Sequence, residues 1–115
     1  MKKTDKKTEK LIVKTLTDAC HIATETVEGF EWLTHFIDYD AFPQSLEVVC
    51  IFDTKESLSK AIQEHQDSFI RSLITDKLRS IDIPIKDSSK QISFDTEEAC
   101  EAEHNGNWAK RFLSQ

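Results

Sequence analysis

The pattern Phe-Asp-Thr-x-Glu occurs twice in this chain, at residues 52–56 and again at residues 94–98. Each copy follows an apolar run and precedes a polar stretch with helical periodicity, so each predicts a strand that turns directly into a helix. An aspartate or threonine at such a junction accepts hydrogen bonds from free N–H groups of the first helical turn, and the glutamate that follows can reach back. The repeat therefore predicts two similar junctions, but it does not predict an activity.

The periodicity of apolar residues predicts an α+β domain in the order α-β-β-α-(α)-β-α. Strands are expected at residues 30–38, 46–52 and 91–95, and helices at residues 5–27, 55–79 and 97–103, with a final helical turn at 108–113. The helical pattern of residues 55–79 is expected to break at residues 66–68, where Asp67 would cap the second piece. Pro84 prevents a further continuation of this helix, and residues 86–89 are expected to form a turn.

The apolar run Val48–Phe52 is typical of a central strand that is buried on both faces. A helical crossover joins this strand to the third, so the two are expected to lie parallel, whereas the short loop around Phe42 suits an antiparallel hairpin with the first strand. The sequence thus predicts a three-stranded mixed sheet. This order resembles the type II KH-like arrangement, αββααβ, over residues 5–95, which implies a fold found in RNA-binding and ribosome-associated proteins. The Gly-x-x-Gly loop of that family would fall at residues 64–67, which contain two carboxylates and no glycine, so KH-type RNA binding is not expected.

Residues 30–35, 48–54 and 93–101, together with Gly106-Asn107-Trp108, are similar to segments of a family of short, uncharacterised bacterial proteins sometimes labelled Fis-type transcriptional regulators. The label implies a helix-turn-helix near the carboxyl end with basic residues that contact DNA. Residues 95–104 instead carry five carboxylates and no lysine or arginine. A DNA-binding function is therefore not expected from this resemblance.

A chain of 115 residues with 38% hydrophobic residues and only two glycines and two prolines suits one ordered domain over residues 1–115. The sequence contains no apolar run near 18 residues and no secretory signal, so we expect a cytoplasmic protein without membrane contact. Three widely spaced cysteines fit reduced, packed thiols better than disulfide bonds: Cys20, Cys50 and Cys100.

The charge is distributed unevenly along an acidic chain with a net charge of -6. Residues 1–14 hold six lysines against Asp5 and Glu9, a balance of +4, so the remaining residues carry -10. Such an acidic body repels phosphate backbones, which disfavours nucleic-acid binding by the body. The lysine-rich start, residues 1–10, is either the solvated beginning of a helix or a short nucleic-acid contact formed by Lys2, Lys3, Lys6, Lys7 and Lys10.

Asp53 and Asp95 are the candidates for a metal site, because they follow two parallel strands whose carboxyl ends meet. Carboxylates gathered there could hold Mg²⁺, but the simpler hypothesis is that both aspartates cap helices. No Ser-His-Asp arrangement and no glycine-rich phosphate loop is present in the sequence. We therefore expect no catalytic residues, no enzymatic activity and no cofactor.

Aromatic residues are concentrated near the first strand, where five of the ten lie within residues 30–42. One strand cannot turn all of them inward, so Trp32, Tyr39 and Phe42 are the candidate binding residues. An edge strand would also permit pairing with a partner or a second copy. The sequence favours a non-enzymatic binding or regulatory module that contacts another protein. The alternative is an RNA- or ribosome-associated factor that has the KH-like topology without the Gly-x-x-Gly loop.

Overall fold

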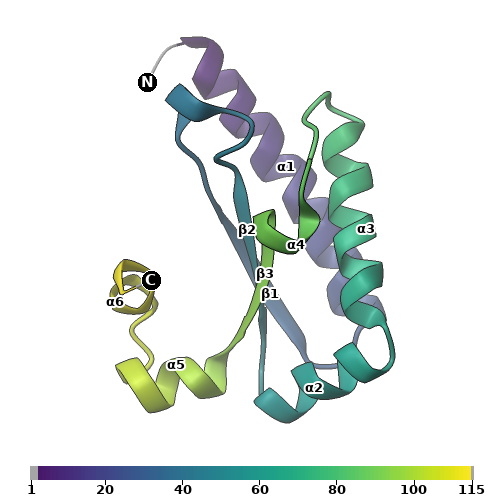
Figure 1. The fold of residues 1–115 in the computed structure, drawn as a ribbon, viewed down its shortest axis with the longest axis vertical. Helices are drawn as coiled ribbons and strands as arrows, with labels where there is room; N and C mark the ends of the chain where they lie inside the picture. The colour runs from purple at the N-terminus through teal and green to yellow at the C-terminus, as the bar shows by residue number, and fades with distance from the viewer. Residues whose placement is uncertain (1–2, 115) are drawn as a thin grey trace.

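The computed structural model describes residues 3–114 and has the α+β architecture that the sequence predicts (Figure 1). Its elements follow in the order α1 (Lys3–Thr26), β1 (Phe30–Phe36), the 3₁₀ helix η1 (Tyr39–Ala41), β2 (Glu47–Phe52), α2 (Lys55–Gln63), α3 (Gln66–Arg79), α4 (Ser88–Gln91), β3 (Ile92–Thr96), α5 (Glu97–His104) and α6 (Trp108–Leu113). None of the helices within residues 3–114 is long and apolar enough to cross a membrane.

The sheet is three-stranded and mixed, as predicted, with β2 between β1 and β3. β1 pairs antiparallel with β2, so that Thr34 lies opposite Val49. β3 pairs parallel with β2, which places Ser93 beside Val49. Val48–Phe52 is buried on both faces, as expected for a central strand. Both β1 and β3 are therefore edge strands.

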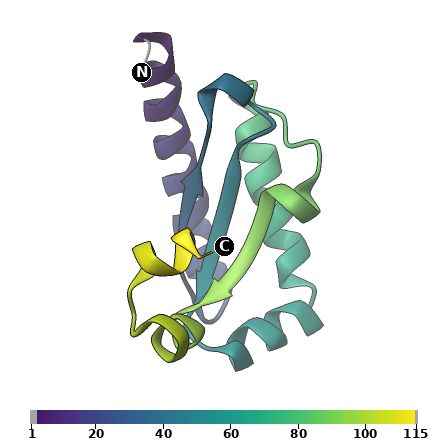
Figure 2. The ribbon, with the colours of Figure 1, turned by 60° about the vertical axis from the view of Figure 1, so that its left-hand side comes forward.

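Two helices, α1 and α3, cover one face of the sheet and enclose the core. In Figure 2 both lie behind the sheet. The apolar stripe predicted for the first helix packs there, and α3 contributes Ile70, Ile74 and Leu78, all at most 1% exposed. The strands supply Cys50, Phe52 and Ile92 from the same face. This core accounts for the burial of β2 toward α1 and α3.

The other face of the sheet is covered only in part, because the short helices α5 and α6 fold back over one end of it. Figure 2 shows α6 in front of the sheet, opposite α1 and α3. Arg111 of α6 holds Asp95 of β3 with a pair of hydrogen bonds of 2.7 and 2.9 Å. The remainder of this face, between α6 and α4, is open.

The two repeated junctions are capped by threonine, and the expectation that Asp53 and Asp95 cap the helices is wrong. Thr54 and Thr96 have extended backbone angles, and their hydroxyls accept hydrogen bonds from the N–H groups of Ser57 and Ala99. The aspartate side chains accept only from the N–H of the next residue in these motifs. An N-cap side chain must reach the second or third residue of the helix, and the threonine is one position closer to it.

The two capping threonines provide a test of this arrangement. Thr96→Ala should lower the free energy of unfolding by about 1 kcal/mol, because the buried N–H of Ala99 loses its acceptor. Thr54→Ala should have a similar effect, while the control Asp53→Ala should cost less than either. Urea denaturation followed by circular dichroism would measure all three. If Asp53→Ala lowers the free energy of unfolding as much as Thr96→Ala does, the aspartate and not the threonine is the cap.

The helix break falls earlier than predicted, and Asp67 does not cap the second helix. α2 ends at Gln63, and α3 begins after His65, which adopts a left-handed conformation with φ of 61° and makes no side-chain cap. The expected turn at residues 86–89 is partly wrong as well, because α4 begins at Ser88 and displaces the start of β3 to Ile92. Asp87 caps α4 through a hydrogen bond from the N–H of Ser89.

Candidate functional site

The carboxyl ends of β2 and β3 meet, and a backbone hydrogen bond and the carboxylate of Glu98 link the two repeats. The N–H of Glu98 donates to the carbonyl oxygen of Asp53 over 3.1 Å. The Glu98 carboxylate in turn accepts from the N–H of Lys55, at the start of α2, over 2.8 Å. Glu98 thus reaches across to the other repeat instead of back to its own, and it stabilises the amino end of α2.

The metal candidate Asp95 is paired with an arginine. Both Asp95 and Arg111 keep only 13% of their side-chain surface exposed, and Glu103 contacts the same guanidinium. Hydrogen bonds to the carboxylates of Asp95 and Glu103 raise the pKa of Arg111. The hydrogen bond from Arg111 in turn lowers the pKa of Glu103. Within the described residues, no three His, Cys, Asp or Glu side chains are grouped so that they could bind a metal ion. Asp53 and Asp95 therefore act here through hydrogen bonds and an ion pair.

The candidate Trp32 packs against α6 through Trp108. Its ring makes an edge contact with Trp108 at 5.2 Å, Trp108 contacts Phe112 at 5.3 Å, and Phe112 contacts Phe36 at 5.0 Å between centroids. We call these four residues the aromatic column. The indole N–H groups of both tryptophans donate to the carboxylate of Glu97. The column packs α6 against β1 from Trp32 to Phe36, and the open part of the sheet begins beside it.

The candidates Tyr39 and Phe42 lie at the other end of the molecule, in the connection between β1 and β2. Their rings stack at 5.8 Å, and both are half-buried. The Tyr39 hydroxyl donates to Glu9 of α1, whose carboxylate also lies 2.7 Å from Nε2 of His35. Burial and the Glu9 carboxylate raise the pKa of Tyr39. Burial opposes the ionisation of Glu9, but the hydrogen bonds with Tyr39 and His35 outweigh it and hold the pKa of Glu9 below its usual range.

The lysine-rich start forms the first turns of α1. Lys3, Lys6, Lys7 and Lys10 are exposed, whereas Lys2 lies outside the described residues. The sequence allowed two interpretations of this segment, the start of a helix or a nucleic-acid contact, and the segment is helical from Lys3 onward. Its lysines are separated from the open face of the sheet, because α1 covers the opposite face.

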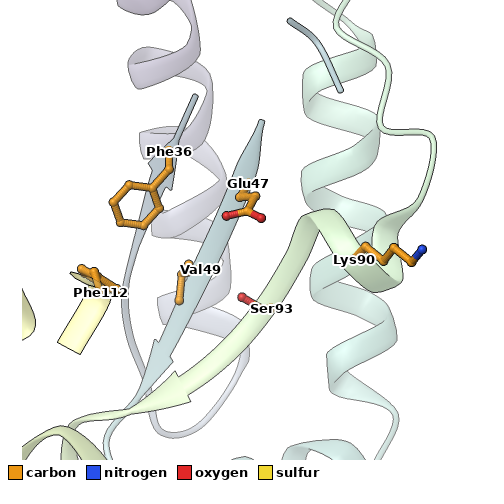
Figure 3. Close-up of a pocket in the computed structure, with 6 residues that line it drawn as sticks. All are labelled: Phe36, Glu47, Val49, Lys90, Ser93 and Phe112. Carbon is orange, nitrogen blue, oxygen red and sulfur yellow. The ribbon is translucent and has the colours of Figure 1, made fainter. Parts of the chain in front are cut away.

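An open hollow of about 440 Å³ lies on the sheet between α6 and α4 (Figure 3). We call it the open-face hollow, and it is lined by Phe36, Glu47, Val49, Lys90, Ser93 and Phe112. A second, apolar depression adjoins it around Ala109 and Leu113 and shares Phe36 and Phe112 with it. Phe36 is 41% exposed and Leu113 is 87% exposed. Apolar side chains of strand and helix thus remain accessible at one continuous site.

Sequence reasoning missed most of this hollow. It placed the binding surface on Trp32, Tyr39 and Phe42, and none of these lines the hollow. The available signal was the two-residue alternation of strands, which puts Glu47, Val49 and Ser93 on one face. A glutamate and a serine in line with an otherwise apolar face indicate that this face is not fully covered.

The cysteines form no reactive site at this face. Cys50 and Cys100 are buried, and burial raises the pKa of the Cys50 thiol to about 12. The thiol of Cys50 is therefore protonated and enclosed, as expected for a packed apolar group. The pKa of Cys100 is raised by burial too.

Comparisons with known proteins gave no match for this chain among protein-family models, curated proteins or solved structures.

Proposed function

We propose that this chain is a small, non-enzymatic protein-interaction module that binds an apolar segment of another protein in the open-face hollow. The observation that carries the proposal is the accessible apolar surface formed by Phe36, Phe112 and Leu113 beside Val49. A continuous apolar surface bordered by polar side chains is typical of a protein-binding site.

The chemistry of the hollow narrows the kind of partner. Its centre is formed by Val49, Phe36 and Phe112, and its borders carry one carboxylate and one ammonium group, Glu47 and Lys90. A partner segment that fits this site has one or two large apolar side chains flanked by charges of both signs. Such aromatic and aliphatic anchors supply most of the affinity in protein interfaces, while the charged rim adds orientation.

A non-catalytic role is supported by the way the carboxylates are used. Asp95 binds Arg111, and Glu98 accepts from the Lys55 N–H, so these two carboxylates at the strand ends are occupied by structural contacts. A general base or a metal ligand must be available to a substrate or an ion. These contacts support a binding role over a catalytic one.

The alternative, an RNA- or ribosome-associated factor, is favoured by one observation. Five exposed lysines follow one another along α1: Lys3, Lys6, Lys7, Lys10 and Lys14. The balance of -10 on the rest of the chain opposes this alternative, because RNA binding requires a continuous basic face.

A substitution in the hollow tests the proposal. Ser93 is exposed in β3, and Ser93→Arg would place a long charged side chain beside Val49 without opening a cavity in the core. We expect this variant to melt near the wild-type temperature and to lose the partner protein that the wild type recovers from a nuclease-treated native lysate. The matched control Ser59→Arg, on the exposed side of α2, should recover the partner in full.

Two further substitutions test whether the partner binds in the open-face hollow or at the candidate residues Tyr39 and Phe42, in the connection between β1 and β2. Tyr39→Ser and Phe42→Ser should leave recovery of the partner unchanged if the hollow is the binding site. If Tyr39→Ser or Phe42→Ser loses the partner while Ser93→Arg retains it, the binding site lies instead in the connection between β1 and β2. A partner that the wild type recovers from an untreated lysate but not from the nuclease-treated one would instead support the RNA-associated alternative.

A further inference from the structure

A hollow lined by basic side chains lies between α3 and the connection that leads from α3 to α4. Its volume is about 260 Å³, and we call it the basic hollow. Three basic side chains and three hydroxyl groups line it: Arg71, Arg79, Lys86, Ser72, Thr75 and Ser88. Figure 2 shows this connection on one side of the molecule and α6 on the other. The basic hollow is therefore a separate site from the open-face hollow, although α4 borders both.

The α3 side of the basic hollow follows from the spacing of its residues. Arg71, Thr75 and Arg79 recur at intervals of four, so they share one face of the helix. Each directly follows one of the buried core residues of α3, which are Ile70, Ile74 and Leu78. The basic face therefore runs along the border of the core, where Arg71 and Thr75 are half-buried and Arg79 is exposed.

Arg71 is held in a fixed orientation. Its guanidinium lies over the ring of Phe94, 4.9 Å from the centroid. Its Nη1 donates to the carbonyl oxygens of Ser88 and Ile92, which anchors the group to α4 and β3. Its Nε and Nη2 have no acceptor within residues 3–114. A guanidinium fixed in this way loses little conformational freedom when its remaining donors bind a ligand.

Arg71 also differs from the other two arginines in its charge partner. Arg79 contacts Asp76, and Arg111 contacts Asp95. Arg71 contacts no carboxylate within the described part of the chain, although acidic residues outnumber lysine and arginine by 21 to 15. A partly buried charge is usually paired. An anion bound in the basic hollow would supply the opposite charge.

The charge of the basic hollow favours an anion. Arg71, Arg79 and Lys86 contribute +3 and Asp76 contributes -1, a balance of +2. Asp76 is an exposed partner of Arg79, and water screens such a contact, so an anion can compete with it. Another hollow, beside α2, is lined by three glutamates and one lysine, a balance of -2. Positive charge is therefore a feature of this place and not of the surface in general.

We propose that the basic hollow binds phosphate, either free or carried by a small molecule. Arg71, Arg79 and Lys86 hold the phosphate oxygens through charge-assisted hydrogen bonds, and the hydroxyls of Ser72 and Ser88 add neutral ones. The charge of a phosphate dianion matches the balance of +2. The acidic remainder of the chain repels a polyanion such as nucleic acid, so a small ligand fits the site better. The inference does not depend on the proposed partner protein.

A titration with inorganic phosphate tests the site. The amide signals of the full chain are followed by NMR at about pH 7, where phosphate approaches a dianion, and chloride keeps the ionic strength constant. We expect saturable shifts at Ser72, Thr75 and Ser88. Arg79→Gln with Lys86→Gln should raise the Kd at least about tenfold, because charge-assisted hydrogen bonds are lost. Both positions are exposed, so this variant should fold like the wild type.

The matched control is Lys14→Gln with Lys55→Gln, which removes the same amount of positive charge at exposed positions outside the basic hollow. This control should bind phosphate with the Kd of the wild type. The inference would be overturned if the wild type shows no saturable shifts, if chloride alone produces the same shifts, or if the control loses as much affinity as the variant of the hollow.

Two further ligands identify the source of the phosphate. If glycerol phosphate binds more tightly than inorganic phosphate, the ligand is a phosphate monoester, whereas equal Kd values assign the hollow to free phosphate. A phosphoserine peptide that binds more tightly than both would overturn the assignment to a small ligand and would assign the hollow to a phosphorylated protein.

Discussion

Replacement of Gly29 by alanine should lower the free energy of unfolding by about 3 kcal/mol, the combined effect of a left-handed backbone and a steric clash. Gly29 has a φ of +88°, and an added Cβ would lie 2.6 Å from Cβ of Ser57 and 2.8 Å from its Oγ. The Cβ of Ser57 is fixed by the backbone of α2 and cannot rotate away. The carbonyl of Gly29 also accepts from the N–H of Asp53, so any backbone shift would disturb the end of β2. A thermal melt should show a decrease of roughly 10 °C or more.

Gly106→Ala is the matched control, because it shares the backbone strain without the rigid clash. Gly106 has a φ of +79°, and its added Cβ would meet only Oε2 of Glu101, at the end of an exposed and flexible side chain. This substitution should cost about 1 to 2 kcal/mol, the penalty of a left-handed residue alone. If Gly29→Ala costs no more than Gly106→Ala, the close approach between the start of β1 and α2 is not as tight as the structure indicates.

Replacement of Arg111 by alanine should lower the free energy of unfolding by about 2 to 3 kcal/mol, because Asp95 would remain in a largely enclosed position without its partner. The loss should be local to the carboxyl-terminal helices, since Arg111 joins α6 to β3. We expect the emission of Trp108 to shift to longer wavelength before the core unfolds, as α6 loosens from the aromatic column. Urea titration followed by tryptophan fluorescence and by circular dichroism would show two transitions that do not coincide.

The control for Arg111 is an arginine in an exposed ion pair. Arg79 contacts Asp76 at 3.4 Å, with more than two thirds of both side chains exposed. Arg79→Ala should change the stability by less than about 1 kcal/mol, because exposed ion pairs are screened by water. Equal effects at the two arginines would mean that the contact between Arg111 and Asp95 is as solvated as the one between Arg79 and Asp76.

The element order could be predicted because it depends on near neighbours in the chain. The repeated junction, the apolar run Val48–Phe52 and the stripe along the first helix each act over a few residues, and each predicted the element that is present. The parallel pairing of β2 and β3 followed from the helical crossover between them. Errors occurred where two local choices were similar in energy, as with threonine and aspartate at the caps, and at His65, whose left-handed conformation is rare for a residue other than glycine.

The candidate site was less predictable, because the functional surface depends on which side chains remain after distant segments have packed. From the sequence, an aromatic residue in a strand such as Trp32 suits an exposed binding surface as well as it suits a packed position. In the structure, Trp32 contacts Trp108 and donates to Glu97, 65 residues away. Tyr39 likewise uses its hydroxyl for Glu9, 30 residues earlier. On the open face of the sheet, the accessible apolar side chains are instead those of Phe36, Phe112 and Leu113, which have no distinguishing pattern in the sequence.

The sequence by itself determined the three strands and the longer helices, the central place of β2 and the uneven charge of α1, since these follow from periodicity, chain handedness and composition. The tertiary structure alone decided that Arg111 binds Asp95, that Glu98 binds the Lys55 N–H 43 residues earlier, and that α6 covers one end of the sheet while the rest stays open. The physical reason is that local periodicity states which face of an element is buried but not what covers it. The covering element is selected by side-chain packing and hydrogen bonds between residues that the chain brings together only when it folds.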